Sequence, residues 1–218
     1  MIPEAGSTFA LDQHIAPIPG CTVSEIAWQH DGMLLAYFAL AAETDISAES
    51  YPGSKIIWAE SGQLQIFDDT GGTWNLEPGD TFVSPIDTPV GMRARTDCVY
   101  AELTLKEGTS MNNLLKTGEV LKLADLLPYQ DGKIINTDLV NNDHVKLALM
   151  SFGAGTGLSE HAAPGQALVF ALDGAGIIGY EGEEHRVVAG QNFAFAKGGR
   201  HYVKADGPFK MALLLMKE

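Results

Sequence analysis

Short apolar stretches recur along the whole chain and are separated by turn residues. In the second half they are ALMSF, ALVFAL, GIIGY, HRVVAG, NFAFA, YVKA and MALLLM. The first half gives AYFAL, KIIWAE, QLQIF, TWNLE, TFVSP, GMRAR and VYAELTL. Stretches of about 4–6 residues at a spacing of about 8–12 residues are typical of strands in a sandwich or barrel. The pattern therefore predicts an all-β protein with few short helices.

Two segments favour a helix instead. One is LADLL at 123–127, and the other is SMNNLLK at 110–116. Ser110 is a suitable N-cap for the second segment, because its hydroxyl can accept a hydrogen bond from the first turn. The segment 110–116 also lies between the two halves of the chain, so it is predicted to connect them.

The two halves of the sequence are copies of one another. At a shift of 112 positions, SAESYPGSKIIWAESG lies over SEHAAPGQALVFALDG. At a shift of 111, LEPGDTFVSP lies over VVAGQNFAFA, and VYAELTLKE lies over KMALLLMKE. An internal repeat of this length predicts two domains of one fold. We expect an N-terminal domain at 1–108 and a C-terminal domain at 109–218, with the first strands of each half packed near the other.

The side chains that could bind a metal or a ligand lie close to two histidines in the second copy. His161 precedes a Pro-Gly turn, and His201 follows a glycine turn. Counting in steps of two places Ala163 on the face of His161, and places Gln166 with two apolar residues on one face of the next strand. If that face is the inside, His161 and Gln166 look into a barrel. The predicted ligand pocket consists of His161, Ala163, Gln166, Leu168, Phe170 and His201.

These two stretches, GTGLSEHAAPGQALVFALDG and GQNFAFAKGGRH, resemble the paired motifs of the cupin superfamily. Ala163 stands where the family has a second histidine, Gln166 where it has a glutamate, and Ala196 where it has a proline. The resemblance implies a bicupin, with two double-stranded β-helix (jelly-roll) barrels in tandem. The positions that fall on the family pattern are Gly155, His161, Gly174, Gly190, Gly198 and His201.

The resemblance also implies a metal, and the residues leave two interpretations open. A divalent transition metal (Zn, Fe, Ni or Mn) would be held by His161, His201 and Gln166, since imidazole suits these ions. Gln166, however, offers only a neutral amide oxygen. The alternative is a relic site without metal, in which the two rings bond to each other, to Gln166 or to water. Glu160 is expected to point outward, because it precedes His161.

The first copy has no metal motif. The positions that match His161, Ala163, Gln166 and His201 in our alignment are Glu49, Tyr51, Ser54 and Val90. Glu49 and Tyr51 could bind a ligand by hydrogen bonds, or they could cap a core.

Charge and composition limit the classes of molecule that this protein could bind. The net charge is −14 and the pI is about 4.7, which disfavours nucleic acid and anionic membranes. The start of the chain lacks the basic and apolar regions of a signal peptide, and no apolar run approaches the roughly 20 residues of a membrane span. We expect a cytoplasmic protein. Cys21 and Cys98 are not paired in any motif and are predicted to be two buried thiols.

Three functions remain. The first is a small-molecule-binding bicupin with a reduced site in its second barrel. The second is a metal-dependent enzyme of dioxygenase or isomerase type, and the third is a structural or regulatory bicupin. The sequence offers no G-x-S-x-G or phosphate-loop motif, and no catalytic residue can be assigned. Because ALVFAL and MALLLM are apolar on both faces, a homodimer is expected; the alternative is that the two barrels cover these faces within one chain.

Overall fold

The computed structural model describes residues 3–217 and is nearly all β. In this range it has eighteen strands, the helix α1 (Leu11–His14) and the 3-10 helix η1 (Leu123–Asp125). The all-β prediction is confirmed, and η1 covers part of the predicted helix at 123–127. The helix predicted at 110–116 is wrong, because Met111 forms an isolated β-bridge with Val140 instead. No helix among these residues is long and apolar enough to cross a membrane.

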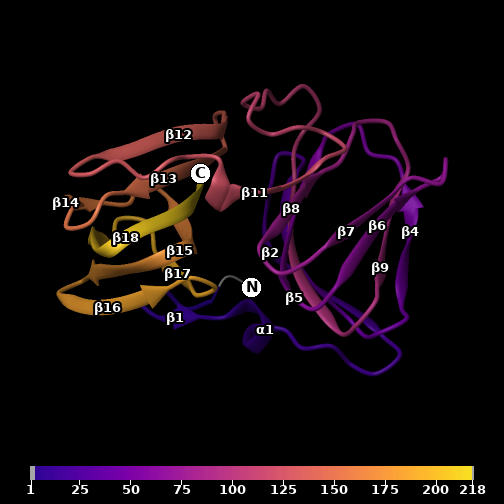
Figure 1. Cartoon of the computed structure of the whole chain (residues 1–218), viewed down its shortest axis with the longest axis horizontal. Helices are drawn as coiled ribbons and strands as arrows, with labels where there is room; N and C mark the ends of the chain where they lie inside the picture. Colours follow the sequence, from indigo (N-terminus) through magenta and orange to yellow (C-terminus); the bar gives the residue numbers. More distant parts are fainter. Residues whose placement is uncertain (1–2, 218) are drawn as a thin grey trace. The chain divides into compact units, whose positions relative to one another are not determined.

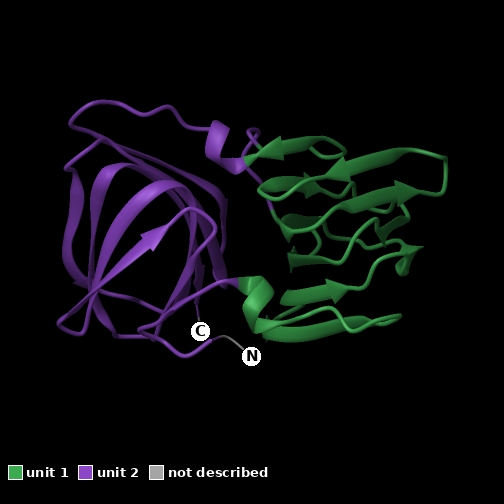
Figure 2. Cartoon of the chain, turned by 60° about the horizontal axis from the view of Figure 1, so that its bottom comes forward, with its two compact units in different colours: residues 1, 11–109, 115–122 green, residues 2–10, 110–114, 123–218 purple. Residues whose placement is uncertain are grey.

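The chain folds into two compact units, each of which closes its own barrel (Figure 2). The N-terminal unit consists of Leu11–Thr109 and Leu115–Lys122. The C-terminal unit consists of residues 3–10, Ser110–Leu114 and residues 123–217 of the described chain. The first strand of each sequence half thus belongs to the other unit, in agreement with the expectation from the repeat.

The N-terminal unit contains two antiparallel sheets. The six-stranded sheet has the order β11-β8-β5-β10-β3-β2, and the four-stranded sheet has the order β4-β9-β6-β7. Its strands are β2 (Thr22–His30), β3 (Met33–Leu40), β4 (Asp45–Glu49), β5 (Lys55–Ser61), β6 (Leu64–Asp68), β7 (Thr73–Leu76), β8 (Asp80–Val83), β9 (Val90–Ala94), β10 (Cys98–Thr104) and β11 (Val120–Lys122).

The C-terminal unit has one continuous eight-stranded sheet with the order β1-β17-β15-β18-β13-β12, to which β14 adds on β18 and β16 adds on β15. Register shifts interrupt the pairing of the long strands β15 and β18, so both bend and the sheet curls into a barrel (Figure 1). Its strands are β1 (Thr8–Phe9), β12 (Ile134–Asn141), β13 (Val145–Phe152), β14 (Gly157–Ala162), β15 (Gln166–Tyr180), β16 (Glu183–Val188), β17 (Asn192–Phe195) and β18 (Arg200–Met216).

Each barrel encloses an apolar core built from alternate residues of its strands. In the N-terminal unit this core includes Ile57, Phe82 and Tyr100. In the C-terminal unit it includes Phe152, Val169 and Phe195. Because each core takes one face of each strand, these clusters identify which residues point inward.

The glycines of the repeat have the same steric role in both copies. A Cβ atom on Gly53 would lie 1.9 Å from the carbonyl oxygen of Leu105, and one on Gly165 would lie 2.1 Å from that of Met216. Only glycine permits such an approach between two backbones. The Pro-Gly turn therefore closes each barrel in the same way.

Candidate functional site

The two histidines lie directly opposite each other on neighbouring strands. In the pairing of β14 with β18, His161 faces His201 after a register shift that follows Leu158. The N-terminal unit repeats this geometry, because Glu49 of β4 faces Val90 of β9 after an equivalent shift. The first copy thus has a site of the same build with different side chains.

The imidazole rings of this pair are in contact. Their centroids are 4.2 Å apart at an interplanar angle of 55°. His161 is exposed, whereas His201 is 7% exposed and its ring stacks on Phe195 at 4.1 Å. The pair therefore spans from the surface to the apolar interior of the barrel.

Backbone carbonyls fix the tautomer of both rings. Nδ1 of His161 is 2.9 Å from the carbonyl oxygen of Ser159, and Nδ1 of His201 is 3.1 Å from that of Gly199. A carbonyl can only accept, so each Nδ1 carries the hydrogen and each neutral ring keeps its lone pair on Nε2. The site therefore presents two Nε2 acceptors side by side.

Burial keeps His201 neutral. Desolvation lowers the pKa of His201 below its ordinary value, and the neighbouring His161 lowers it further, while the hydrogen bond to Gly199 opposes the shift in part. At neutral pH the acceptor character of this ring is thereby maintained.

Both the sequence and the structure are similar to those of known proteins. A cupin domain profile matches residues 148–216, which contain both histidines. A cupin 2 conserved barrel domain protein from Leptotrichia buccalis is 26% identical, with each chain covered over 100% of its length and a TM-score of 0.85. The chain therefore has the cupin fold, and the segment that contains both histidines matches the cupin family. No curated protein matches the sequence.

More distant cupin structures share the fold alone. A glyoxylate-induced protein from Pseudomonas aeruginosa is 12% identical at a TM-score of 0.62, with 99% of this chain and 89% of that chain covered. Salicylate 1,2-dioxygenase from Pseudoaminobacter salicylatoxidans is 11% identical at a TM-score of 0.58, with 85% of this chain and 68% of that chain covered. Proteins with this fold thus include an oxygenase, but these identities carry no activity over to this chain.

The inward residues of β15 differ from those predicted. Ala167, Val169 and Ala171 belong to the core, together with their partners on β17 and β18. Alternation therefore places Gln166, Leu168 and Phe170 on the opposite face of β15, so the predicted pocket needs correction at these three positions. Their partners on β18 are Met216, Leu214 and Ala212.

Ala163 and Ala167 are the inward neighbours of the histidine pair. Ala163 is 4% exposed, and its backbone nitrogen donates to the carbonyl of Gly199. Ala167 pairs with Phe195, the residue that stacks on His201. Both positions hold a methyl group, so neither adds a polar atom to the site.

Glu160 points away from the histidines, as alternation predicts. Its carboxylate accepts from the guanidinium of Arg200, with Nε at 3.0 Å from Oε1. These two residues flank His161 and His201 along the chain and occupy the outer face of their strands. Glu160 is therefore engaged in an ion pair outside the barrel.

The donor set does not fit a tightly held metal. The two Nε2 atoms could serve as ligands, but no group of three His, Cys, Asp or Glu side chains suited to a metal occurs in residues 3–217. Stable transition-metal sites in proteins have three or four protein ligands. The geometry accordingly fits hydrogen bonding to the imidazole pair better than a resident ion.

Sequence reasoning missed two polar residues inside the other barrel. Lys55 corresponds to Ala167 in the repeat, and Glu102 lies on β10. Their ion pair is buried, with 2.9 Å between Lys55 Nζ and Glu102 Oε1. The repeat aligns Lys55 with Ala167, but the inward position of Ala167 is known only from the structure, so the sequence offers no signal for this lysine. Cys21 also departs from expectation, because it is exposed, whereas Cys98 is buried.

Proposed function

We propose that this chain binds a small, largely apolar molecule in its C-terminal barrel and holds a hydrogen-bond donor of that molecule at His161 and His201. The observation that carries the proposal is the shared tautomer of the two rings. Two adjacent Nε2 lone pairs form an acceptor pair that suits a hydroxyl or an N–H group. Such a group would lie at the boundary between solvent and the apolar core.

The surrounding side chains support an apolar body for this ligand. The residues that pack with the pair are aromatic or aliphatic, and the one directly against His201 is Phe195. Pockets for small molecules combine an apolar lining with a few polar groups that fix orientation. The histidine pair would supply that orientation, and the aromatic core would supply the contact area.

Phenol is a suitable probe, because it has an apolar ring and a single hydroxyl donor. We expect saturable binding of phenol to the full chain by isothermal titration calorimetry at pH 7.5. His161→Ala should weaken binding at least tenfold, since it removes one acceptor from an exposed residue without disturbing the core. His185→Ala is the matched control in the same barrel and should bind phenol like the parent.

Two outcomes would overturn the proposal: no phenol binding by the parent, or equal binding by His161→Ala. Elemental analysis of protein prepared without chelators or a histidine tag addresses the metal-dependent alternative. A stoichiometric transition metal in that preparation would favour the dioxygenase or isomerase reading instead. The homodimer and the cytoplasmic location stay predictions.

A further inference from the structure

The N-terminal barrel contains a buried ion pair on its inner face. Lys55 Nζ and Glu102 Oε1 are 2.9 Å apart, and the two side chains are 11% and 3% exposed. Lys55 lies two residues before the core residue Ile57 on β5, and Glu102 lies two residues after the core residue Tyr100 on β10. Both strands thus point these charges into the barrel. A buried pair of this kind is weak evidence for stability, because desolvation offsets the attraction.

A short chain of contacts links this pair to the surface. The ammonium of Lys55 lies over the ring of Tyr51, with 3.6 Å from Nζ to the centroid. The hydroxyl of Tyr51 in turn donates to Oε2 of Glu49, which is exposed. Tyr51 therefore covers the buried pair at the open side and is itself held by a surface carboxylate.

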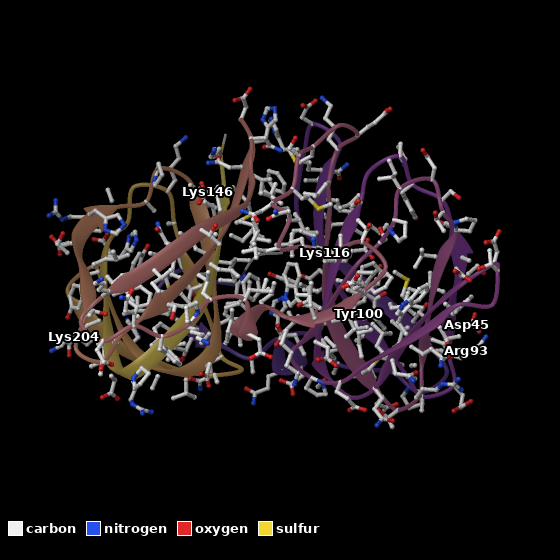
Figure 3. All side chains as sticks on the ribbon, turned by 45° about the horizontal axis from the view of Figure 1, so that its top comes forward. Asp45, Arg93, Tyr100, Lys116, Lys146 and Lys204 are labelled. Carbon is white, nitrogen blue, oxygen red and sulfur yellow. The ribbon has the colours of Figure 1, made fainter. Side chains whose placement is uncertain are left out.

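Tyr100 adds a buried hydroxyl without a partner among the described residues. Its side chain is fully buried, and its ring stacks on Phe38 at 4.8 Å with an interplanar angle of 5°. Figure 3 places Tyr100 among the strands of the N-terminal barrel. Burial and the nearby carboxylate of Glu102 raise the pKa of Tyr100 well above its ordinary value, so the hydroxyl stays protonated and can donate.

These residues occupy the position that holds the histidine pair in the other barrel. At the shift of 112 positions, Glu49, Tyr51 and Lys55 correspond to His161, Ala163 and Ala167. The pairing of Glu49 with Val90 repeats that of His161 with His201. The polar cluster is therefore located at the same opening of the fold, although its chemistry is different.

We propose that the N-terminal barrel is a second binding site, which takes a small uncharged polyol through two neighbouring hydroxyl groups. One ligand oxygen accepts from the ammonium of Lys55 and the hydroxyl of Tyr100, and the adjacent hydroxyl donates to the carboxylate of Glu102. The charges of Lys55 and Glu102 cancel, so a neutral ligand leaves the buried site neutral, whereas a charged ligand would not. A vicinal diol matches this donor and acceptor pair.

The three tryptophans allow the site to be tested in the full chain. Trp28, Trp58 and Trp74 all belong to the N-terminal unit, so intrinsic fluorescence reports on this barrel. Xylitol is the probe, and gluconate is the charged control. We expect a saturable change in fluorescence with xylitol, and an affinity for gluconate that is at least tenfold weaker.

Tyr100→Phe is the decisive variant, because it removes the hydroxyl and keeps the ring that stacks on Phe38. We expect xylitol binding to weaken at least tenfold, without any loss of thermal stability. Tyr37→Phe is the matched control: its hydroxyl is also buried without a partner in the described chain, but it lies on the opposite face of β3 from Phe38. The Tyr37→Phe variant should bind xylitol with the affinity of the parent.

The double variant Lys55→Met with Glu102→Leu removes both charges together and leaves no unpaired ion. It should fold and should not bind xylitol. The proposal is overturned if the parent gives no saturable response to xylitol, if Tyr100→Phe binds like the parent, or if the double variant still binds. His161→Ala should leave xylitol binding unchanged, so this site and the histidine site can fail separately.

Discussion

Burial disfavours the charged form of Glu60 in the N-terminal unit and of His201 in the C-terminal unit. Desolvation raises the pKa of Glu60 from 4.5 to about 7, and Asp12 adds to the shift. Desolvation lowers the pKa of His201. The two shifts have opposite consequences for stability, because one group is an acid and the other a base.

Glu60 should destabilise the folded protein as the pH rises. Between pH 4.5 and about 7 the folded state retains a proton that the unfolded state has released, so stability falls through this window and stays low above it. Glu60→Gln keeps a neutral side chain and should be more stable than the parent at pH 8, by up to about 3 kcal/mol. At pH 4.5 the difference should largely vanish.

The measurement is urea unfolding followed by tryptophan fluorescence at both pH values, which reports on the N-terminal unit. An equal difference at pH 4.5 and pH 8 would show that the charge of Glu60 is not the cause.

For His201 the pH dependence of stability has the opposite sign. The neutral ring contributes fully to the free energy of unfolding above the unfolded pKa of about 6.5, and this contribution is lost as the pH falls through the lowered pKa of the folded state.

Single residues could be predicted where a local motif surrounds them. His161 and His201 each lie beside a glycine turn, and the repeat fixes their relation to Glu49 and Val90, so their pairing follows from sequence. The ion pair of Lys55 and Glu102 could not be found this way. Its members lie far apart in the sequence, and a lysine or glutamate in a strand normally marks the solvent face.

At the scale of the strand, the turns and the repeat predict where strands lie, but not which face of β15 is inside. Both faces of this strand are apolar, with Val169 on one and Leu168 on the other. Alternation gives a direction only when one face is polar. The Pro-Gly turn before β15 also breaks the count that begins at His161. Alternation alone therefore does not decide the face of Gln166, which in the structure lies opposite the core face of β15.

The assignment of Ala167, rather than Gln166, to the inner face of β15 can be tested directly. Ala163→His with Ala167→Glu should create a site with three histidines and one carboxylate, and should bind Zn at least tenfold more tightly than the parent by calorimetric titration. A long polar side chain fits at the second position, since Lys55 occupies it in the other copy. Gln166→Glu is the control and should gain no affinity. Equal gains from both proteins would contradict the assigned face.

At the scale of the molecule, the chain passes between the two units four times within the described residues, at 10/11, 109/110, 114/115 and 122/123. Two short strands result from this path. β1 pairs with β17 in the C-terminal unit, and β11 pairs with β8 in the N-terminal unit. The repeat predicts two barrels and the packing of each first strand near the other half, but strands of two and three residues carry too little pattern for their bounds and pairing partners to be predicted.

Removal of β11 should weaken the N-terminal unit. A chain of residues 11–122 retains β11, whereas a chain of 11–109 leaves the edge of β8 unpaired, and unpaired edges promote association. We expect 11–109 to unfold at lower urea concentration than 11–122 and to self-associate in light scattering. If both fragments were equally stable monomers, β11 would have no structural role in this unit.

The exchange of short strands also sets an order of events during synthesis. The ribosome delivers Thr8 and Phe9 long before their partners Phe193 and Asn192 exist. The first strand therefore stays unpaired until Asn192 and Phe193 have emerged, so the C-terminal barrel closes after the strands of the N-terminal barrel are complete. Contacts between such distant points of the chain form slowly, and an open strand edge is exposed to other nascent chains meanwhile.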